Sequence, residues 1–165
     1  MTNGQFMRFF YFASFNAIVT AIWTALIIIP PEILNLRLPQ IIAGGSVGTW
    51  FFVGYITFMI VGCAGILGCG TVHYVISAVK NKTPNSKATW LGLILWEIGL
   101  LGSTWLLGWS GFVGGTGLLN GVPIPQIHES IIGYVQPIGI LIGIAIIGFL
   151  ISIINVYVAL ARRAK

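Results

Sequence analysis

The segment from Ile131 to Leu160 reads IIGYVQPIGILIGIAIIGFLISIINVYVAL and carries no charged side chain. A helix crosses the roughly 30 Å apolar core of a bilayer with about 20 residues. The segment is therefore long enough to span a membrane as a helix. Three further stretches predict spans on the same grounds, at residues 9–29, 48–79 and 89–112.

The composition of the whole chain agrees with a membrane protein. Of the 165 residues, 57% are hydrophobic and 7% are charged, whereas soluble domains carry about 25% charged residues. This hydrophobicity excludes a disordered chain, and two cysteines are too few for a secreted disulfide scaffold. We therefore expect a single all-α integral membrane domain over residues 1–165, with four transmembrane helices.

The basic residues predict the orientation of these helices. Seven of the eight lysines and arginines fall on one side of the four spans, and only Arg37 falls on the other. The seven are Arg8, Lys80, Lys82, Lys87, Arg162, Arg163 and Lys165. Because positive residues favour the cytoplasmic side, we expect a multi-pass protein of the cell membrane with both termini in the cytoplasm. The net charge of +5 then reflects topology and contact with anionic lipid, and no nucleic acid partner is expected.

Tryptophans and small residues add two expectations about packing. Trp50 and Trp109 are predicted near the external ends of spans, and Trp90 near a cytoplasmic end, as interfacial anchors. The cysteines Cys63 and Cys69 lie six residues apart on one helix, which is too far for a disulfide. The glycines between and around them are expected to allow close helix–helix approach; they are Gly62, Gly65, Gly68 and Gly70.

Glu97 is the one acidic residue predicted inside a span. A carboxylate in the hydrocarbon region is costly unless it is paired or protonated. Two interpretations stay open. Glu97 is either a proton or ion site, with Asn16, Gln136 and Asn155 as polar helpers, or a protonated carboxyl that is hydrogen-bonded at a helix–helix contact.

The two histidines are predicted on opposite sides of the membrane. His73 lies near the cytoplasmic end of the second span and is a candidate haem ligand, the alternative being a hydrogen-bonded histidine at the interface. His128 falls in an external loop predicted over residues 114–130, so one chain cannot supply both ligands of a haem. His128 and Glu129 are interpreted as the polar start of the fourth helix, with Ser130 as a candidate cap. No metal site and no cofactor bound by this chain alone are expected, although haem or quinone at a subunit interface stays open.

Four short motifs follow one another along the chain: TWFFVGYIT at residues 49–57, KTPNS at 82–86, LGLILW at 91–96 and GLLNGVP at 117–123. In this order they resemble the C-terminal helices of subunit I of haem-copper terminal oxidases. The B-type enzymes of archaea and some thermophilic bacteria are the most similar. The first motif resembles the family's ligand helix, Thr-x-Trp-Val-Pro-Gly-His-x-His.

The chain departs from this family where the family binds haem. The two ligand histidines fall on Tyr55 and Thr57, and the Arg-Arg pair that holds the haem propionates falls on Ile124 and Pro125. The resemblance therefore implies a non-catalytic relative. It would be an accessory, non-redox structural subunit of a respiratory chain complex, a quinol or cytochrome oxidase, which packs against the catalytic subunit and stabilises assembly.

Two other function classes stay open. One is a small oligomeric transporter or channel that uses Glu97 as its ion or proton site. The other is a redox subunit that binds haem or quinone in its own right. An enzyme acting alone is not expected, because the sequence offers no acid–base pair and no nucleophile with a base.

Overall fold

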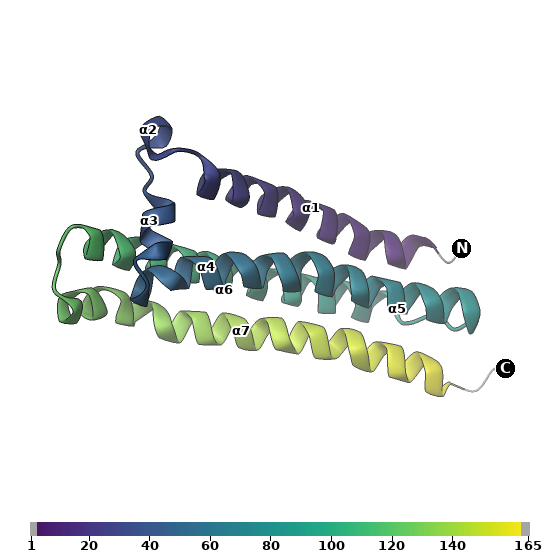
Figure 1. The fold of residues 1–165 in the computed structure, drawn as a ribbon. Coiled ribbons are helices and arrows are strands. Elements are labelled where there is room, and N and C mark those ends of the chain that lie inside the picture. Colours follow the sequence, from purple (N-terminus) through teal and green to yellow (C-terminus); the bar gives the residue numbers. More distant parts are fainter. Residues whose placement is uncertain (1–2, 163–165) are drawn as a thin grey trace.

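The computed structural model describes residues 3–162, and over that range it contains helices and no strand. Four helical segments are long and apolar enough to cross a membrane. They are α1 (Asn3–Ile28), a composite second span (Ser46–Val79), α6 (Ser86–Leu119) and α7 (Ile124–Ala161). They lie along one another as an elongated bundle (Figure 1). The predicted all-α class and the four apolar spans are confirmed.

The second span is built from four consecutive pieces. These are a 3₁₀ turn η1 (Ser46–Gly48), α4 (Thr49–Thr57), a π-helical segment η2 (Phe58–Gly65) and α5 (Ile66–Val79). The span ends at Val79, as predicted. A π-helix pairs residue i with i+5 and has a wider turn than an α-helix, and such segments often occur at functional sites. Nothing in the hydropathy of the segment predicts it.

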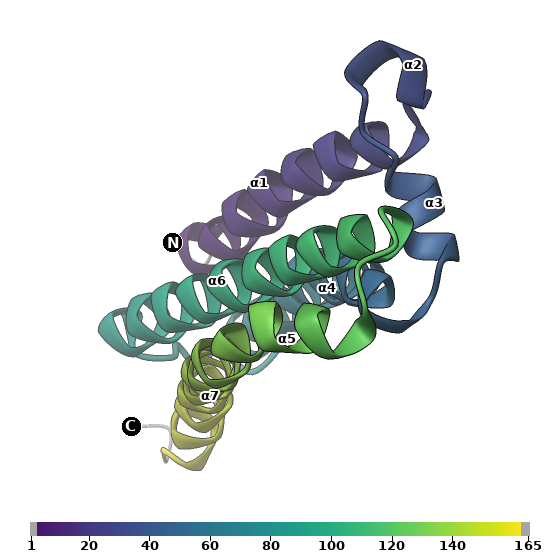
Figure 2. The same cartoon turned by 90° about the vertical axis from the view of Figure 1, so that its left-hand side faces the viewer.

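The central helix of the bundle is α6. Half of its most apolar stretch is buried within the protein, against 22% for α1 and 17% for α7. Figure 2 shows α6 between α1 and α7. The two flanking helices consequently leave most of their apolar surface to lipid or to other proteins.

Glycines bring α6 and α7 into backbone contact. A Cβ atom on Gly99 would overlap the backbone nitrogen of Ala145 and the carbonyl oxygen of Leu141, both on α7. A Cβ on Gly148 of α7 would overlap the backbone of Trp96 and Gly92, and one on Gly92 of α6 would meet the Ser152 hydroxyl and the Gly148 carbonyl. Such contacts are how membrane helices associate closely.

The glycines predicted to mediate packing do so unequally. A Cβ on Gly70 would lie 2.5 Å from the Cβ of Phe9, and one on Gly62 would lie 3.1 Å from the amide nitrogen of Asn16, so both face α1 closely. Gly65 would make only an ordinary contact, and Gly68 faces open space. The two cysteines nearby are both free thiols, as expected.

The connection between the last two helices is much shorter than predicted. We expected α6 to end near residue 112 and an external loop over residues 114–130, but α6 continues to Leu119 and α7 begins at Ile124. The glycine-rich end stays helical because its glycines are packed. A Cβ on Gly114 would overlap Val47 of η1, and one on Gly115 would overlap Ile41.

The predicted start of the fourth helix is also wrong, because the prolines before residue 131 begin the helix and do not interrupt it. Pro123 precedes the first turn of α7 and Pro125 lies within it, where a missing N–H costs no hydrogen bond. His128, Glu129 and Ser130 consequently lie inside the helix. Ser130 does not cap it, because its hydroxyl donates to the carbonyl of Ile127 (2.7 Å).

The apolar segment after α1 covers one end of the bundle. The first helix ends at Ile28, just before the Pro30-Pro31 pair, as expected from the fixed φ of proline. Two short helices follow, α2 (Pro31–Leu34) and α3 (Leu38–Ala43). Leu38 and Ile41 of α3 are buried in a cluster with Phe51 of α4, so these two apolar side chains of the connection pack inside the protein.

Both described chain ends lie at the other end of the bundle, beside the α5–α6 turn (Figure 1). The guanidinium of Arg8 donates to the hydroxyl of Ser86 (2.7 Å) and lies 5.0 Å from the ring centroid of Trp90. The ammonium of Lys82 donates to the carbonyl of Arg162. Arg163 and Lys165, two of the basic residues that predict the orientation, lie outside the described residues. The cytoplasmic location of this end stays a prediction.

Two tryptophans of α6 give a scale for depth in the membrane. Trp90 lies near the α5–α6 turn, and Trp109 donates its indole N–H to the hydroxyl of Tyr134 near the opposite end (3.2 Å). The two are 19 residues apart, which is about 28 Å along a helix and close to the apolar thickness of a bilayer. The prediction that both tryptophans are interfacial anchors therefore implies that the residues of α6 between them face the hydrocarbon core.

Candidate functional site

Glu97 lies at the contact of three spans, inside the protein. Its side chain on α6 is 6% exposed, and its Oε2 accepts a hydrogen bond from Nδ2 of Asn16 on α1 (3.0 Å). The same amide of Asn16, which is fully buried, donates to the carbonyl of Gly62 in the π-helical segment (3.1 Å). Two of the residues that the sequence suggested for one site are therefore brought together.

The remaining oxygens of this pair lack partners. Neither Oε1 of Glu97 nor Oδ1 of Asn16 has a hydrogen bond within residues 3–162. A buried polar atom without a partner costs about 1–3 kcal/mol. Two such atoms on two residues that are already bonded to each other mark this place as chemically unusual.

A stripe of polar side chains on α1 leads away from Glu97. Asn16, Thr20 and Thr24 are spaced four residues apart, so they share one face of the helix. The Thr20 hydroxyl lies 3.6 Å from Sγ of Cys63. The Thr24 hydroxyl donates to the carbonyl of Thr20 (2.8 Å), so the hydroxyl of Tyr55, 2.8 Å away, donates to Thr24. The stripe runs toward the α2 end; its four-residue spacing is visible in the sequence, but we did not predict it.

The two other proposed helpers of Glu97 lie elsewhere. Gln136 is on the exposed face of α7. Asn155 joins the far end of α7 to the start of α6: its Oδ1 accepts from the backbone N–H of Asn85 (2.8 Å), and its Nδ2 donates to the Asn85 carbonyl and the Thr89 hydroxyl (both 3.0 Å). Asn155 therefore holds the α5–α6 turn in place.

His73 is enclosed by its own chain. Its ring is 1% exposed, and its centroid lies 4.7 Å from that of Phe9 on α1. The ring faces the backbone of Ser152 on α7, but the geometry falls short of a hydrogen bond, and neither ring nitrogen has a partner among the described residues. In this packing neither nitrogen is open to a haem held by another subunit. His128 is exposed on the first turns of α7, at the opposite end of the bundle.

The positions that resemble the oxidase ligand helix have other contacts here. The Tyr55 hydroxyl bonds to Thr24, as described above. Thr57 lines an apolar groove on the other side of the span. No cluster of three metal-ligating side chains occurs in the part of the chain that the structure describes.

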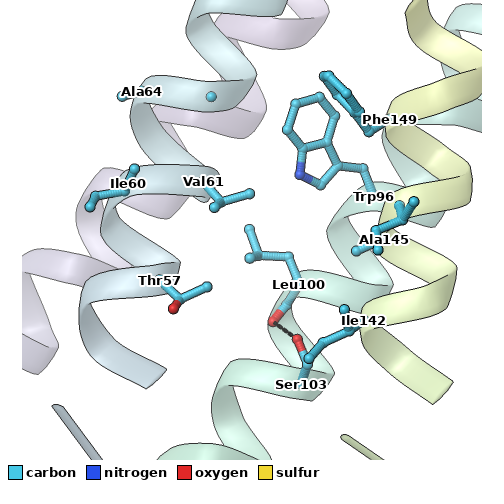
Figure 3. A pocket seen from close by; sticks show the side chains of 12 residues that line it. Thr57, Ile60, Val61, Ala64, Trp96, Leu100, Ser103, Ile142, Ala145 and Phe149 are labelled. Carbon is cyan, nitrogen blue, oxygen red and sulfur yellow. Dashed lines mark hydrogen bonds between the residues drawn. The ribbon is translucent and has the colours of Figure 1, made fainter. Parts of the chain in front are cut away.

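That groove is a lateral cavity on the long side of the bundle. It has a volume of about 460 Å³ and lies between the second span and α7, with α6 as its floor. In Figure 3, Ile60, Val61 and Ala64 form one wall, and Ala145 and Phe149 are on the opposite side. The full lining is Thr57, Ile60, Val61, Ala64, Gly65, Trp96, Leu100, Ser103, Ile142, Ala145, Ile146 and Phe149.

The floor of the groove is formed by the middle part of α6, at Trp96, Leu100 and Ser103. Trp96 packs edge-on against Phe149 (centroids 5.2 Å apart, 83° between planes), and the floor residues of α6 fall between Trp90 and Trp109. Ile60 and Ile146 on its two rims are 55% and 52% exposed. The groove therefore opens on the long side of the bundle.

Neither a known family model, nor a curated protein, nor a solved structure matches this chain significantly. The resemblance to subunit I consequently depends on the motifs quoted above alone.

Proposed function

We propose that this protein is an accessory, non-redox subunit of a respiratory membrane complex, a haem-copper quinol or cytochrome oxidase of the cell membrane. The observation that carries the proposal is the lateral apolar groove. It has the size of a ligand pocket, an apolar lining, and small residues on both walls, Ala64 and Gly65 on one and Ala145 on the other. Small residues let a second helix approach closely, so the groove suits a transmembrane helix of a partner subunit.

The sequence motifs support an oxidase as the partner. The contacts of the two residues that stand at the family's haem-ligand positions support it as well. Where the oxidase family places haem-ligating histidines, this chain has a hydroxyl bonded within the protein, Tyr55, and a groove residue, Thr57. A chain that has the motif order of subunit I but lacks its haem ligands is suited to packing beside the catalytic subunit. Its role there would be to exclude lipid from that subunit and to stabilise the assembly.

Purification from native membranes in a mild detergent tests this proposal. We expect large haem-containing respiratory subunits to copurify, identified by mass spectrometry and by a reduced-minus-oxidised optical spectrum. After the partners are stripped away, this chain should be colourless. A stable monomer that retains no partner contradicts the proposal, and colour that stays with the chain favours a redox subunit with His73 as ligand.

A second candidate function is favoured by the unpartnered carboxyl oxygen of Glu97. A small oligomeric transporter or channel would use Glu97 as its ion or proton site, since intramembrane carboxyls often lie on such pathways. Proteoliposomes that contain the wild type should then show ion or proton flux that Glu97→Gln abolishes. Equal background leak in both preparations rules this function out.

A further inference from the structure

We propose that Glu97 and Asn16 hold one proton between them, as a proton-binding site that exchanges with water from the α2 end of the bundle along the polar stripe of α1. The site is defined by Glu97 Oε1, which carries the proton, and by Asn16 Oδ1, which accepts it. It is independent of the accessory role proposed above.

The hydrogen-bond inventory of the pair supports a proton. Both hydrogens of the Asn16 amide are used, one on Oε2 of Glu97 and one on the Gly62 carbonyl. What remains are two acceptors, Oε1 and Oδ1, and both lack a donor. A protonated carboxyl and a primary amide can pair through two hydrogen bonds, one in each direction. One proton on Oε1, donated to Oδ1, would satisfy both atoms at once.

A metal cation fits this site less well than a proton does. Hard cations are bound by about six or more oxygens, and the site offers two free ones. The Gly62 carbonyl, which the π-helical turn presents to α1, is already occupied by Asn16. An unpaired carboxylate in an apolar interior is very costly, and no lysine or arginine is buried among the described residues.

The other titratable groups on the packed elements do not supply a countercharge. On the second span these are Tyr55, Cys63, Cys69, His73 and Tyr74. His73 is 11 positions from Gly62 along that span, about 16 Å at the rise of an α-helix. The described parts of α1 and α7 bury no charged side chain.

Access to the site is one-sided. On the side of Glu97 that faces the α5–α6 turn lie two apolar side chains, Leu93 and Ile66. Both are fully buried (0% exposed). Toward the α2 end, the Thr20, Thr24 and Tyr55 hydroxyls continue from Asn16. In exchange, the proton leaves Oε1 for a water molecule, which yields a carboxylate and hydronium, and the hydroxyls of the stripe can bond that water.

Infrared difference spectroscopy of the full chain in lipid tests the proton. The spectrum of the wild type minus that of Glu97→Gln should contain the carbonyl band of a protonated carboxyl at neutral pH, and added Na⁺ should not remove it. Glu97→Gln should unfold at the temperature of the wild type, because the Gln amide can donate to Asn16 Oδ1 and accept from its Nδ2. Glu97→Leu should be less stable. Absence of the band overturns the proposal, and its removal by Na⁺ identifies a cation site instead.

The route is tested by the rate at which the same band shifts after transfer to D₂O. The double variant Thr20→Val with Thr24→Val should slow the shift about tenfold, a barrier increase of about 1.4 kcal/mol. The matched control is Thr71→Val, since Thr71 makes the same type of hydrogen bond to its own helix (Leu67 carbonyl, 3.0 Å) but lies on an exposed face of α5. Equal exchange rates in the double variant and the control would overturn the outward route.

Discussion

Replacing Gly99 by alanine is expected to destabilise the protein by about 3 kcal/mol, at the upper end of overpacking costs. The added methyl group would overlap the backbone nitrogen of Ala145 and the carbonyl oxygen of Leu141. Backbone atoms cannot rotate away as a side chain can, so α7 would have to move outward. That movement would also loosen the contacts at Gly92 and Gly148, where the same two helices meet.

The matched control for this variant is Gly143→Ala on the facing helix. A Cβ on Gly143 would meet no atom within 4 Å. Since alanine is favoured over glycine in a helix by about 0.5–1 kcal/mol, this variant should be unchanged or slightly stabilised. Thermal unfolding of the purified full chain in detergent, followed by loss of the monodisperse species, measures both. Similar losses in the two variants would contradict the assigned α6–α7 contact.

The span count and the apolar class could be predicted because they depend on local composition. An uncharged apolar run as long as 131–160 predicts a membrane helix by itself. Prolines end helices through their fixed φ and missing N–H, as at Pro30. The same local reasoning failed at residues 113–119. Glycine there indicates a loop when read alone, but the glycines are packed against η1 and α3, and the helix continues to Leu119.

The candidate site could be predicted only in part because it depends on the register between helices. The sequence pointed to Glu97 and Asn16, which are 81 residues apart, but it grouped them with Gln136 and Asn155, which lie elsewhere. Which polar residues meet is set by the packing of α1 on α6. The π-helical segment that presents Gly62 is a change in backbone hydrogen bonding and has no signature in hydropathy.

The second large effect is expected for partner binding at the lateral groove. Ile146 lines the groove and is 52% exposed, whereas its neighbour Ile147 is 53% exposed and does not line it. A tryptophan at position 146 would place its ring where a partner helix is proposed to dock. Because interface hot spots are worth about 2 kcal/mol or more, Ile146→Trp should reduce partner affinity about 30-fold. Ile147→Trp is the matched control, because it adds the same bulk to another face of the same helix and should leave partner affinity unchanged. Neither variant should alter the unfolding temperature of the isolated chain.

Recovery of partner subunits with each tagged variant, purified in mild detergent from the native host, is the most direct measurement. The accessory-subunit account predicts that haem-containing subunits are recovered with the wild type and with Ile147→Trp and are largely lost from Ile146→Trp. Equal recovery with both tryptophan variants, or none with the wild type, would contradict the account.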